Sequence, residues 1–291
     1  SMWAIPAQQA FMPWAKPLII ESDAGIVAMA VEEIWDGMKV ATPLECGWGL
    51  AAPFAGPDPD RLISTLATAW KRLFPAIDAV LLSGLPEQGP WRDAVIGRFL
   101  RSHRVGAGET CIRRMSSLAQ GYEGFLALRS SKFRSNLKRS IRQATQAGMA
   151  FDYRRTGQRK ELFKRMMAIE ERSWKGRAGE GINTGTPRSF YKMILKRLLE
   201  KNAVRILFAQ IDGKDIGYVF GGVANGIYRG LQISFDDEFK SLSPGNLLQI
   251  ELIKLLCEEG VSTYDLGTDI EYKTRWAEAS FETVTWAIFQ N

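Results

Sequence analysis

The chain has 291 residues, of which 46% are hydrophobic and 24% are charged. This composition excludes an intrinsically disordered chain, and the length suits one large domain or two ordinary ones. The sequence contains no run of about 20 apolar residues, the length of a transmembrane helix, and it does not open on a signal-peptide pattern. We therefore expect a cytoplasmic protein without a transmembrane segment.

Residues that commonly bind metals are few and scattered. Cys46, Cys111 and Cys257 are too widely spaced for a zinc motif, and they favour a reducing compartment over a disulfide framework. The single histidine, His103, excludes a two-histidine metal motif and argues against a serine–histidine–acid triad. We expect no metal site and a solvated loop position for His103.

The first half of the chain mixes strands and helices without a regular alternation of the two. Runs of apolar and β-branched residues between proline- and glycine-rich turns indicate the strands, and aspartates before an amphipathic run indicate a helix start. The predicted elements are strands over 17–21, over 25–33 and from 47 into a loop, a helix from Asp58 or Asp60 to about Phe74, a parallel strand over 79–85 and a helix over 91–102.

A basic amphipathic segment follows near the start of the second half. Apolar residues recur every three or four positions from Leu126 to Ala144, which predicts a helical segment that ends at Gly148. No acid lies between Glu123 and Asp152. Three roles fit this face: a solvated surface, a guide for an acidic ligand such as a phosphate, and a nucleic-acid contact. Its basic residues are Arg129, Lys132, Arg134, Lys138, Arg139 and Arg142.

A glycine-rich segment divides the next group of predicted elements. A strand over 151–156 and a helix over 158–174 precede it, and a helix over 187–201 follows it. The segment itself, over 176–185, has the length and flexibility of a lid, and a plain linker is the alternative. A last strand is predicted over 281–289.

Two hairpin signals make residues 203–267 the most informative stretch. The dipeptides at 212–213 (Asp-Gly) and 225–226 (Asn-Gly) separate apolar runs, so three strands should form an antiparallel meander. A helix over about 244–259 then crosses over to a further strand at 263–266. The SPG turn before this helix brings backbone N–H groups together, which favours a phosphate-bearing ligand.

Four motifs in the second half together resemble a known family. They read FRSNLKRSIRQATQAG, ERSWKG around Trp174, YRGLQISFDDEFKSLSPGNLL and YDLGTDIEYKTRWA. This combination resembles the bacterial CelD/Bcs-type, acetyltransferase-like branch of the GNAT superfamily, which is related to the Fem-type peptidyltransferases. The resemblance implies an α+β (mixed α/β) fold of two tandem GNAT-like domains, with a central, mostly antiparallel sheet flanked by helices. The domains would span 2–115, in degenerate form, and 116–291.

The resemblance also implies a binding site for acetyl-CoA or another acyl-CoA as co-substrate. In such proteins, the meander strands and the turn into the next helix hold the pantetheine and the pyrophosphate. The residues implied here are Gln232, Ile233, Ser243, Pro244, Gly245, Asn246 and Leu247.

Candidates for the chemistry follow the parallel strand. Acyl transfer needs a base for the nucleophile and donors for the developing oxyanion. By resemblance, Lys273 faces the phosphates of the donor or the acceptor, and an exposed surface lysine is the alternative. Asp269 is the weaker candidate, either as general base or as N-cap of a short helix, and Asp265 fits a turn carboxylate at least as well as a catalytic one. Candidate substrate contacts are Trp174, Arg134 and Tyr272.

The leading hypothesis is an acyltransferase that moves an acetyl or acyl group from acyl-CoA to an amine or hydroxyl of a small molecule or an envelope precursor. One alternative is a Fem-like aminoacyltransferase that uses aminoacyl-tRNA, with the basic segment binding RNA. Another is a non-catalytic protein that keeps the fold and binds a ligand. The sequence leaves the acceptor, the acyl chain and the oligomeric state open.

Overall fold

The computed structural model describes residues 3–45, 48–49, 51–73 and 76–290. Cys46, the predicted strand start at 47 and the predicted helix end at Phe74 lie outside the described residues. The chain forms two compact units, unit 1 from residues 1–113 and 281–291, and unit 2 from residues 114–280. Two strands, β6 (Arg104–Ser117) and β12 (Ala279–Phe289), run from the residue range of one unit into that of the other.

Unit 1 packs helices against a mixed sheet. Its strands pair in the order β1-β2-β3-β5-β12, with β3 and β5 parallel and the other neighbours antiparallel. The elements within this unit are α1 (Ala4–Phe11), β1 (Lys16–Ser22), β2 (Gly25–Glu33), η1 (Trp35–Gly37), β3 (Lys39–Pro43), β4 (Phe54–Ala55), α2 (Pro59–Leu73), β5 (Ala79–Pro86) and α3 (Pro90–Phe99).

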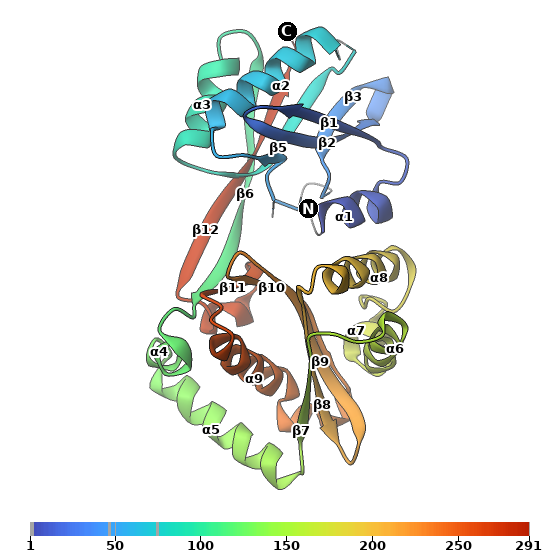
Figure 1. Cartoon of the computed structure of the whole chain (residues 1–291), viewed down its shortest axis with the longest axis vertical. Coiled ribbons are helices and arrows are strands. Elements are labelled where there is room, and N and C mark those ends of the chain that lie inside the picture. Colours follow the sequence, from blue (N-terminus) through green and yellow to red (C-terminus); the bar gives the residue numbers. More distant parts are fainter. Residues whose placement is uncertain (1–2, 46–47, 50, 74–75, 291) are drawn as a thin grey trace. The chain divides into compact units, whose positions relative to one another are not determined.

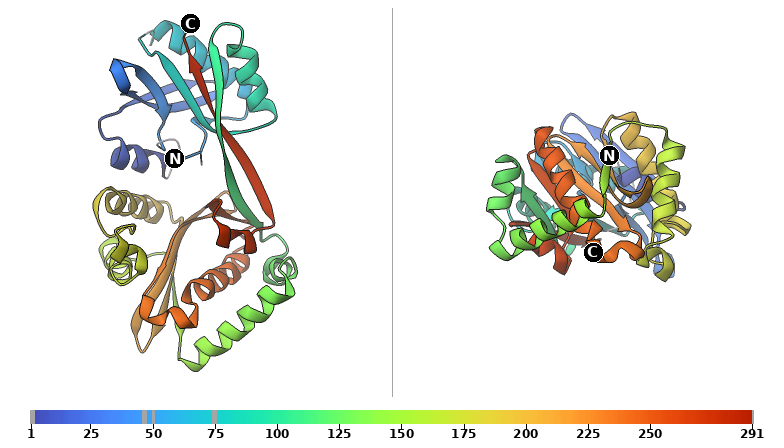
Figure 2. Two further views of the ribbon diagram at one scale, coloured as in Figure 1. Left: turned by 180° about the vertical axis from the view of Figure 1, so that it is seen from behind. Right: turned by 90° about the horizontal axis from the view of Figure 1, so that it is seen from below.

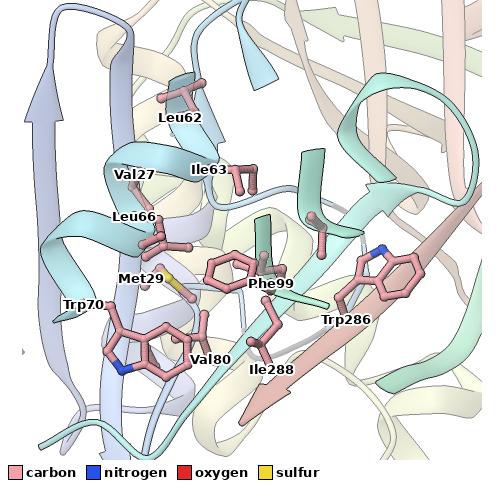
Figure 3. Packing of buried hydrophobic residues seen from close by; sticks show 14 of the residues in the cluster. Val27, Met29, Leu62, Ile63, Leu66, Trp70, Val80, Phe99, Trp286 and Ile288 are labelled. Carbon is pink, nitrogen blue, oxygen red and sulfur yellow. The ribbon is translucent and has the colours of Figure 1, made fainter. Parts of the chain in front are cut away.

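The core of unit 1 forms between α2, α3 and the sheet (Figure 3). Leu62, Ile63 and Leu66 share one face of α2 because helical neighbours on a face are three or four residues apart. The N-terminus of α2 is capped by Asp58, whose carboxylate accepts the N–H of Arg61 at 3.1 Å. The predicted strands over 17–21, 25–33 and 79–85 and both predicted helices are present. Of the strand predicted from residue 47, the described residues form only the two-residue β4.

Unit 2 is built on the predicted meander. Asp212 and Gly213 have φ values of 49° and 74°, and Asn225 and Gly226 have 50° and 74°. Positive φ at both central residues is what a two-residue type I′ hairpin requires. The strands β8 (Val204–Ile211), β9 (Lys214–Ala224) and β10 (Ile227–Phe235) are accordingly antiparallel neighbours.

The crossover helix and the parallel strand are also confirmed. Helix α9 spans Pro244–Glu258, and β11 (Thr263–Thr268) lies parallel to β10. The remaining elements of unit 2 are α4 (Gly121–Ala127), α5 (Ser131–Gln146), β7 (Ala150–Arg154), α6 (Arg159–Glu170), α7 (Trp174–Ala178), α8 (Gly185–Glu200), η2 (Asp237–Leu242) and η3 (Glu271–Arg275).

Helices cover both faces of the sheet in unit 2. Helices α4, α5 and α9 lie on one face, and α6, α7 and α8 lie on the other (Figures 1 and 2). Within this unit the strand order is β11-β10-β9-β8-β7. The predicted class, a mixed α/β fold with a mostly antiparallel sheet flanked by helices, is therefore confirmed.

Two predicted helices are each broken into two. The basic segment is not one helix, because Ser130 caps a new start by accepting the N–H of Phe133 at 3.2 Å, so α4 ends before α5 begins. Arg129, in this break, is 5% exposed and pairs with Glu278, which removes it from the exposed basic face. The helix predicted over 158–174 likewise ends at Glu170, and Ser173 caps α7 by accepting the N–H of Gly176 at 3.1 Å.

Candidate functional site

The neighbouring strands β10 and β11 separate part-way along unit 2. They pair only from Ile227 to Arg229 on β10 and from Thr263 to Asp265 on β11. Beyond this point β10 continues to Phe235 and β11 to Thr268. We call the space between 230–235 of β10 and 266–268 of β11 the opening. Its edges carry backbone groups that no longer bond to the opposite strand.

A bulge in β10 lies at the start of the opening. The register between β10 and β9 shifts between Gly230 and Gln232, which leaves Leu231 without a partner on β9. Tyr191 of α8 donates its hydroxyl to the carbonyl of Leu231 at 2.8 Å. The bulged peptide is thus held in place from the α8 side of the sheet.

An ion pair closes the inner end of the opening. Arg229 and Asp265 are the last paired residues of the two strands, are 8% and 3% exposed, and form a salt bridge. Asp265 also accepts the N–H of Gly267 at 2.9 Å. These contacts fit the turn-carboxylate interpretation of Asp265, because its oxygens stabilise the end of β11.

Lys273 lies beside this ion pair rather than on an exposed helix face. Its ammonium donates to the carbonyl of Thr268, at the end of β11, at 2.8 Å. Burial, and then the charge of Arg229, lower the pKa of Lys273 from its ordinary value to about 8. Lys273 therefore changes charge close to physiological pH.

Asp269 is poorly suited to act as a general base. Its two oxygens accept hydrogen bonds from Arg114 at 2.8 and 3.2 Å, and these bonds lower the pKa of the carboxyl group. A carboxylate with a depressed pKa accepts protons poorly at neutral pH. Asp269 does not cap the short helix η3 either, since the N-cap there is Ile270.

The predicted phosphate turn leads into α9. Ser243 adopts a left-handed conformation with φ of 56°, and Pro244 occupies the first helical turn. The N–H groups of Asn246 and Leu247 already bond to the carbonyl of Ser243, at 3.1 and 3.3 Å. The N–H of Gly245 is therefore the most available donor of this turn.

A pocket of about 280 Å³ opens beside the start of α9. It lies between α5 and η3, and it contains two basic side chains, Lys132 and Arg275. Asn246 and Tyr272, both predicted as site residues, line this pocket. Its other lining residues are Ser130, Phe133, Asn136, Leu137, Ser140 and Trp276.

Other predicted residues lie elsewhere in unit 2. Arg134 does not line the pocket, because its guanidinium donates to the backbone carbonyls of Leu126 and Arg129 at the end of α4. Trp174 lies on α7, on the opposite face of the sheet, and is 50% exposed. Ile233 accepts a hydrogen bond on its carbonyl from Lys175 at 3.0 Å.

The sequence interpretation missed a buried carboxylate on the α6 face. Glu170 is 0% exposed and accepts the hydroxyl of Tyr218 at 2.8 Å, the amide of Gln232 at 3.1 Å and the N–H of Ile182 at 3.2 Å. This network ties the last turn of α6 to the opening and to the glycine-rich segment. One signal was available, since Glu170 continues the apolar stripe of α6 after Met166.

Within the described residues, histidine, cysteine and acidic side chains form no cluster suited to a metal ion. None of the helices in the described ranges combines the length and the apolar character needed to cross a bilayer.

Comparison with known proteins agrees with this geometry. A family model described as an acetyltransferase (GNAT) domain matches residues 131–274. No curated protein matches the chain in sequence. Among solved structures, FemX has a TM-score of 0.69 at 10% identity, over 98% of this chain and 90% of its own.

Two further solved structures share the fold along nearly the whole chain. A conserved protein of unknown function from Bacteroides thetaiotaomicron VPI-5482 has a TM-score of 0.66 at 11% identity, over 99% of this chain and 90% of its own. The L-PGS structure from Bacillus licheniformis has a TM-score of 0.59 at 12% identity, over 95% of this chain and 84% of its own. The chain therefore has a GNAT acyltransferase fold, and its residues 131–274 match a GNAT-type acetyltransferase domain.

Proposed function

We propose that this protein transfers an acyl group from acyl-CoA to an amine or hydroxyl acceptor, with the thioester held in the opening between β10 and β11. The observation that carries the proposal is the separation of these strands directly after Arg229 and Asp265. It leaves backbone groups of β10 beyond Arg229 without a partner on β11, and in the proposal an extended pantetheine arm bonds to these groups. The bulge at Leu231 lies at the point where the carbonyl of the thioester would arrive.

The nucleotide end of the donor would lie toward α9 and α5. The first turn of α9 offers its N–H of Gly245 and the positive end of the helix dipole to a phosphate. Lys132 and Arg275 in the adjacent pocket add two positive charges, and Phe133 and Tyr272 supply aromatic faces. The donor would thus enter from the α9 face of the sheet.

In the proposed reaction, the acceptor nitrogen or oxygen attacks the thioester carbon. A C–N or C–O bond forms, the C–S bond breaks, and the proton lost by the acceptor ends on the CoA thiol. Negative charge develops on the carbonyl oxygen in the transition state. We assign Lys273, in its charged form, to stabilise that oxygen, because it lies beside the inner end of the opening.

Calorimetric titration with acetyl-CoA tests the donor site. Asn246→Asp places a negative charge beside the bound phosphates, while an acid in the first turn favours the helix itself by about 0.3–1 kcal/mol. We expect Asn246→Asp to fold normally and to weaken acetyl-CoA binding about tenfold or more. Gln158→Glu, which adds the same charge at the start of α6, should bind as wild type does. Equal affinity in the two variants would place the donor elsewhere.

Aminoacyl-tRNA is the second candidate donor, and the exposed basic face of α5 is the observation that favours it. Lys132, Lys138, Arg139 and Arg142 are all exposed there. A tRNA donor would give a log–log dependence of affinity on salt with a slope of about −0.7 to −0.9 per phosphate contact. Reversal of Lys138 and Arg139 to glutamate would reduce that slope, whereas reversal of Lys192 and Lys196 on α8 would not. Binding of acetyl-CoA without binding of tRNA would support acyl-CoA as the donor.

A further inference from the structure

Two lysine ammonium groups lie one on each side of the opening. Lys175 of α7 donates to the carbonyl of Ile233 on β10 at 3.0 Å. Lys273 donates to the carbonyl of Thr268 on β11 at 2.8 Å. Each lysine thus bonds to a neutral backbone oxygen, and neither forms a salt bridge with any described residue.

The acids near these lysines already have other partners. Around Lys273, Asp265 pairs with Arg229 and Asp269 pairs with Arg114. Around Lys175, Glu170 is the acid among the described residues whose charge raises the pKa of the lysine, and it accepts three hydrogen bonds from other groups. The donors to Glu170 are neutral, so its negative charge offsets part of the charge of the lysine pair, and a net positive charge remains within the site.

The two lysines also share a partly buried environment. Burial lowers the pKa of Lys175, and the charge of Glu170 only partly opposes this. Burial and the charge of Arg229 lower the pKa of Lys273, the charges of Asp265 and Asp269 partly oppose this, and the charge of Lys175 adds a smaller lowering. Two like charges that disfavour each other in a partly buried space gain stability when an anion lies between them.

The position of Lys175 indicates which substrate brings that anion. Lys175 reaches the opening from α7, on the face of the sheet opposite α9 (Figure 1). In the proposed reaction the donor occupies the α9 side, so the acceptor must reach the thioester carbon from the α7 side.

We propose that Lys175 and Lys273 together hold one anionic group, a carboxylate or a phosphate, of the acceptor. This inference rests on the proposed function, in that it takes the opening as the place of transfer. It narrows the acceptor to molecules that carry a negative charge near the amine or hydroxyl that is acylated.

Lysine side-chain NMR of the full chain tests the inference, with inorganic phosphate and acetate as probes. Lys175→Met and Lys273→Met assign the two resonances, and Lys254, exposed on α9, is the reference. Without a probe, both lysines should titrate below their ordinary pKa of 10.5. A saturating probe should raise both pKa values by about 1 or more and leave Lys254 unchanged. Lys175→Met should weaken the probe's effect on Lys273 about tenfold.

The comparison of probes and a competition with free CoA complete the test. A stronger effect of phosphate indicates a phosphorylated acceptor, and a stronger effect of acetate indicates a carboxylate. Responses of Lys175 and Lys273 no larger than that of Lys254 would overturn the inference. Displacement of the probe by CoA would also overturn it, because the anionic group held between the two lysines would then belong to the donor and not to the acceptor. Failure of the proposed function can be distinguished from failure of this inference. In that case acetyl-CoA would not bind, whether or not the probe binds.

Discussion

Replacement of Lys273 by methionine should lower kcat/KM by about 10²–10³, the typical cost of losing one donor to a transition-state oxyanion. The variant should fold normally. A lysine with a pKa depressed to about 8 is disfavoured in its charged form by the folded protein, so removing the charge costs no stability. Methionine keeps most of the aliphatic stem. Turnover with a confirmed acceptor, measured across pH, is the relevant assay.

The pH profile separates the proposed role of Lys273 from that of a base. In the wild-type protein, the charged form is lost as pH rises through about 8, so kcat/KM should fall above that pH. The Lys273→Met variant should lack this decline. Lys254→Met, a change of the same kind on an exposed part of α9, should behave as wild type. Activity of Lys273→Met within a few-fold of wild type, or a wild-type rate that increases through pH 8, would contradict the assignment.

Replacement of Arg229 by methionine should lower the free energy of unfolding by about 3–5 kcal/mol, because it leaves Asp265 buried without its cation. Asp265→Leu should be similarly costly, because it removes the carboxylate that compensates the charge of the buried arginine. The double variant, with methionine and leucine at these positions, should recover much of the loss, since an apolar pair needs no compensation. Urea denaturation of the wild type, both single variants and the double variant gives the coupling energy directly.

The stabilities of these variants also test how much the Arg229–Asp265 pair contributes to forming the opening. A loss below about 1 kcal/mol in Arg229→Met, in the range of a surface ion pair, would show that this pair contributes little to the end of the β10–β11 pairing. If the double variant is no more stable than either single variant, each charge must stabilise the site through contacts other than the pair itself.

The elements predicted well are those that local chemistry determines. The dipeptides Asp212-Gly213 and Asn225-Gly226 fix the hairpins because both residues must adopt positive φ. Helix α9 follows from its continuous apolar run after Pro244. By contrast, β6 has no apolar run, contains two glycines and is mostly exposed or half-buried, so its strand character depends on pairing with distant parts of the chain.

The same distinction applies to the site. Lys273 follows a strand end, and Asn246 lies at the start of a helix, so sequence motifs could predict the position of Lys273 near the opening and of Asn246 and Tyr272 in the pocket beside α9. The contacts of Glu170 could not, because its partners come from β9, β10 and the glycine-rich segment. The position of Lys175 could not be predicted for a related reason. Lys175 directly precedes the glycine-rich segment, and only the tertiary fold brings it to β10.

A crystal structure of the protein with CoA bound tests the central claim most directly. The thiol end should lie in the opening, between 230–235 of β10 and 266–268 of β11, with the phosphates at the first turn of α9 and the nucleotide beside α5. CoA bound outside the opening, or an empty opening at concentrations well above the dissociation constant measured by calorimetry, would contradict the proposed acyl-transfer site.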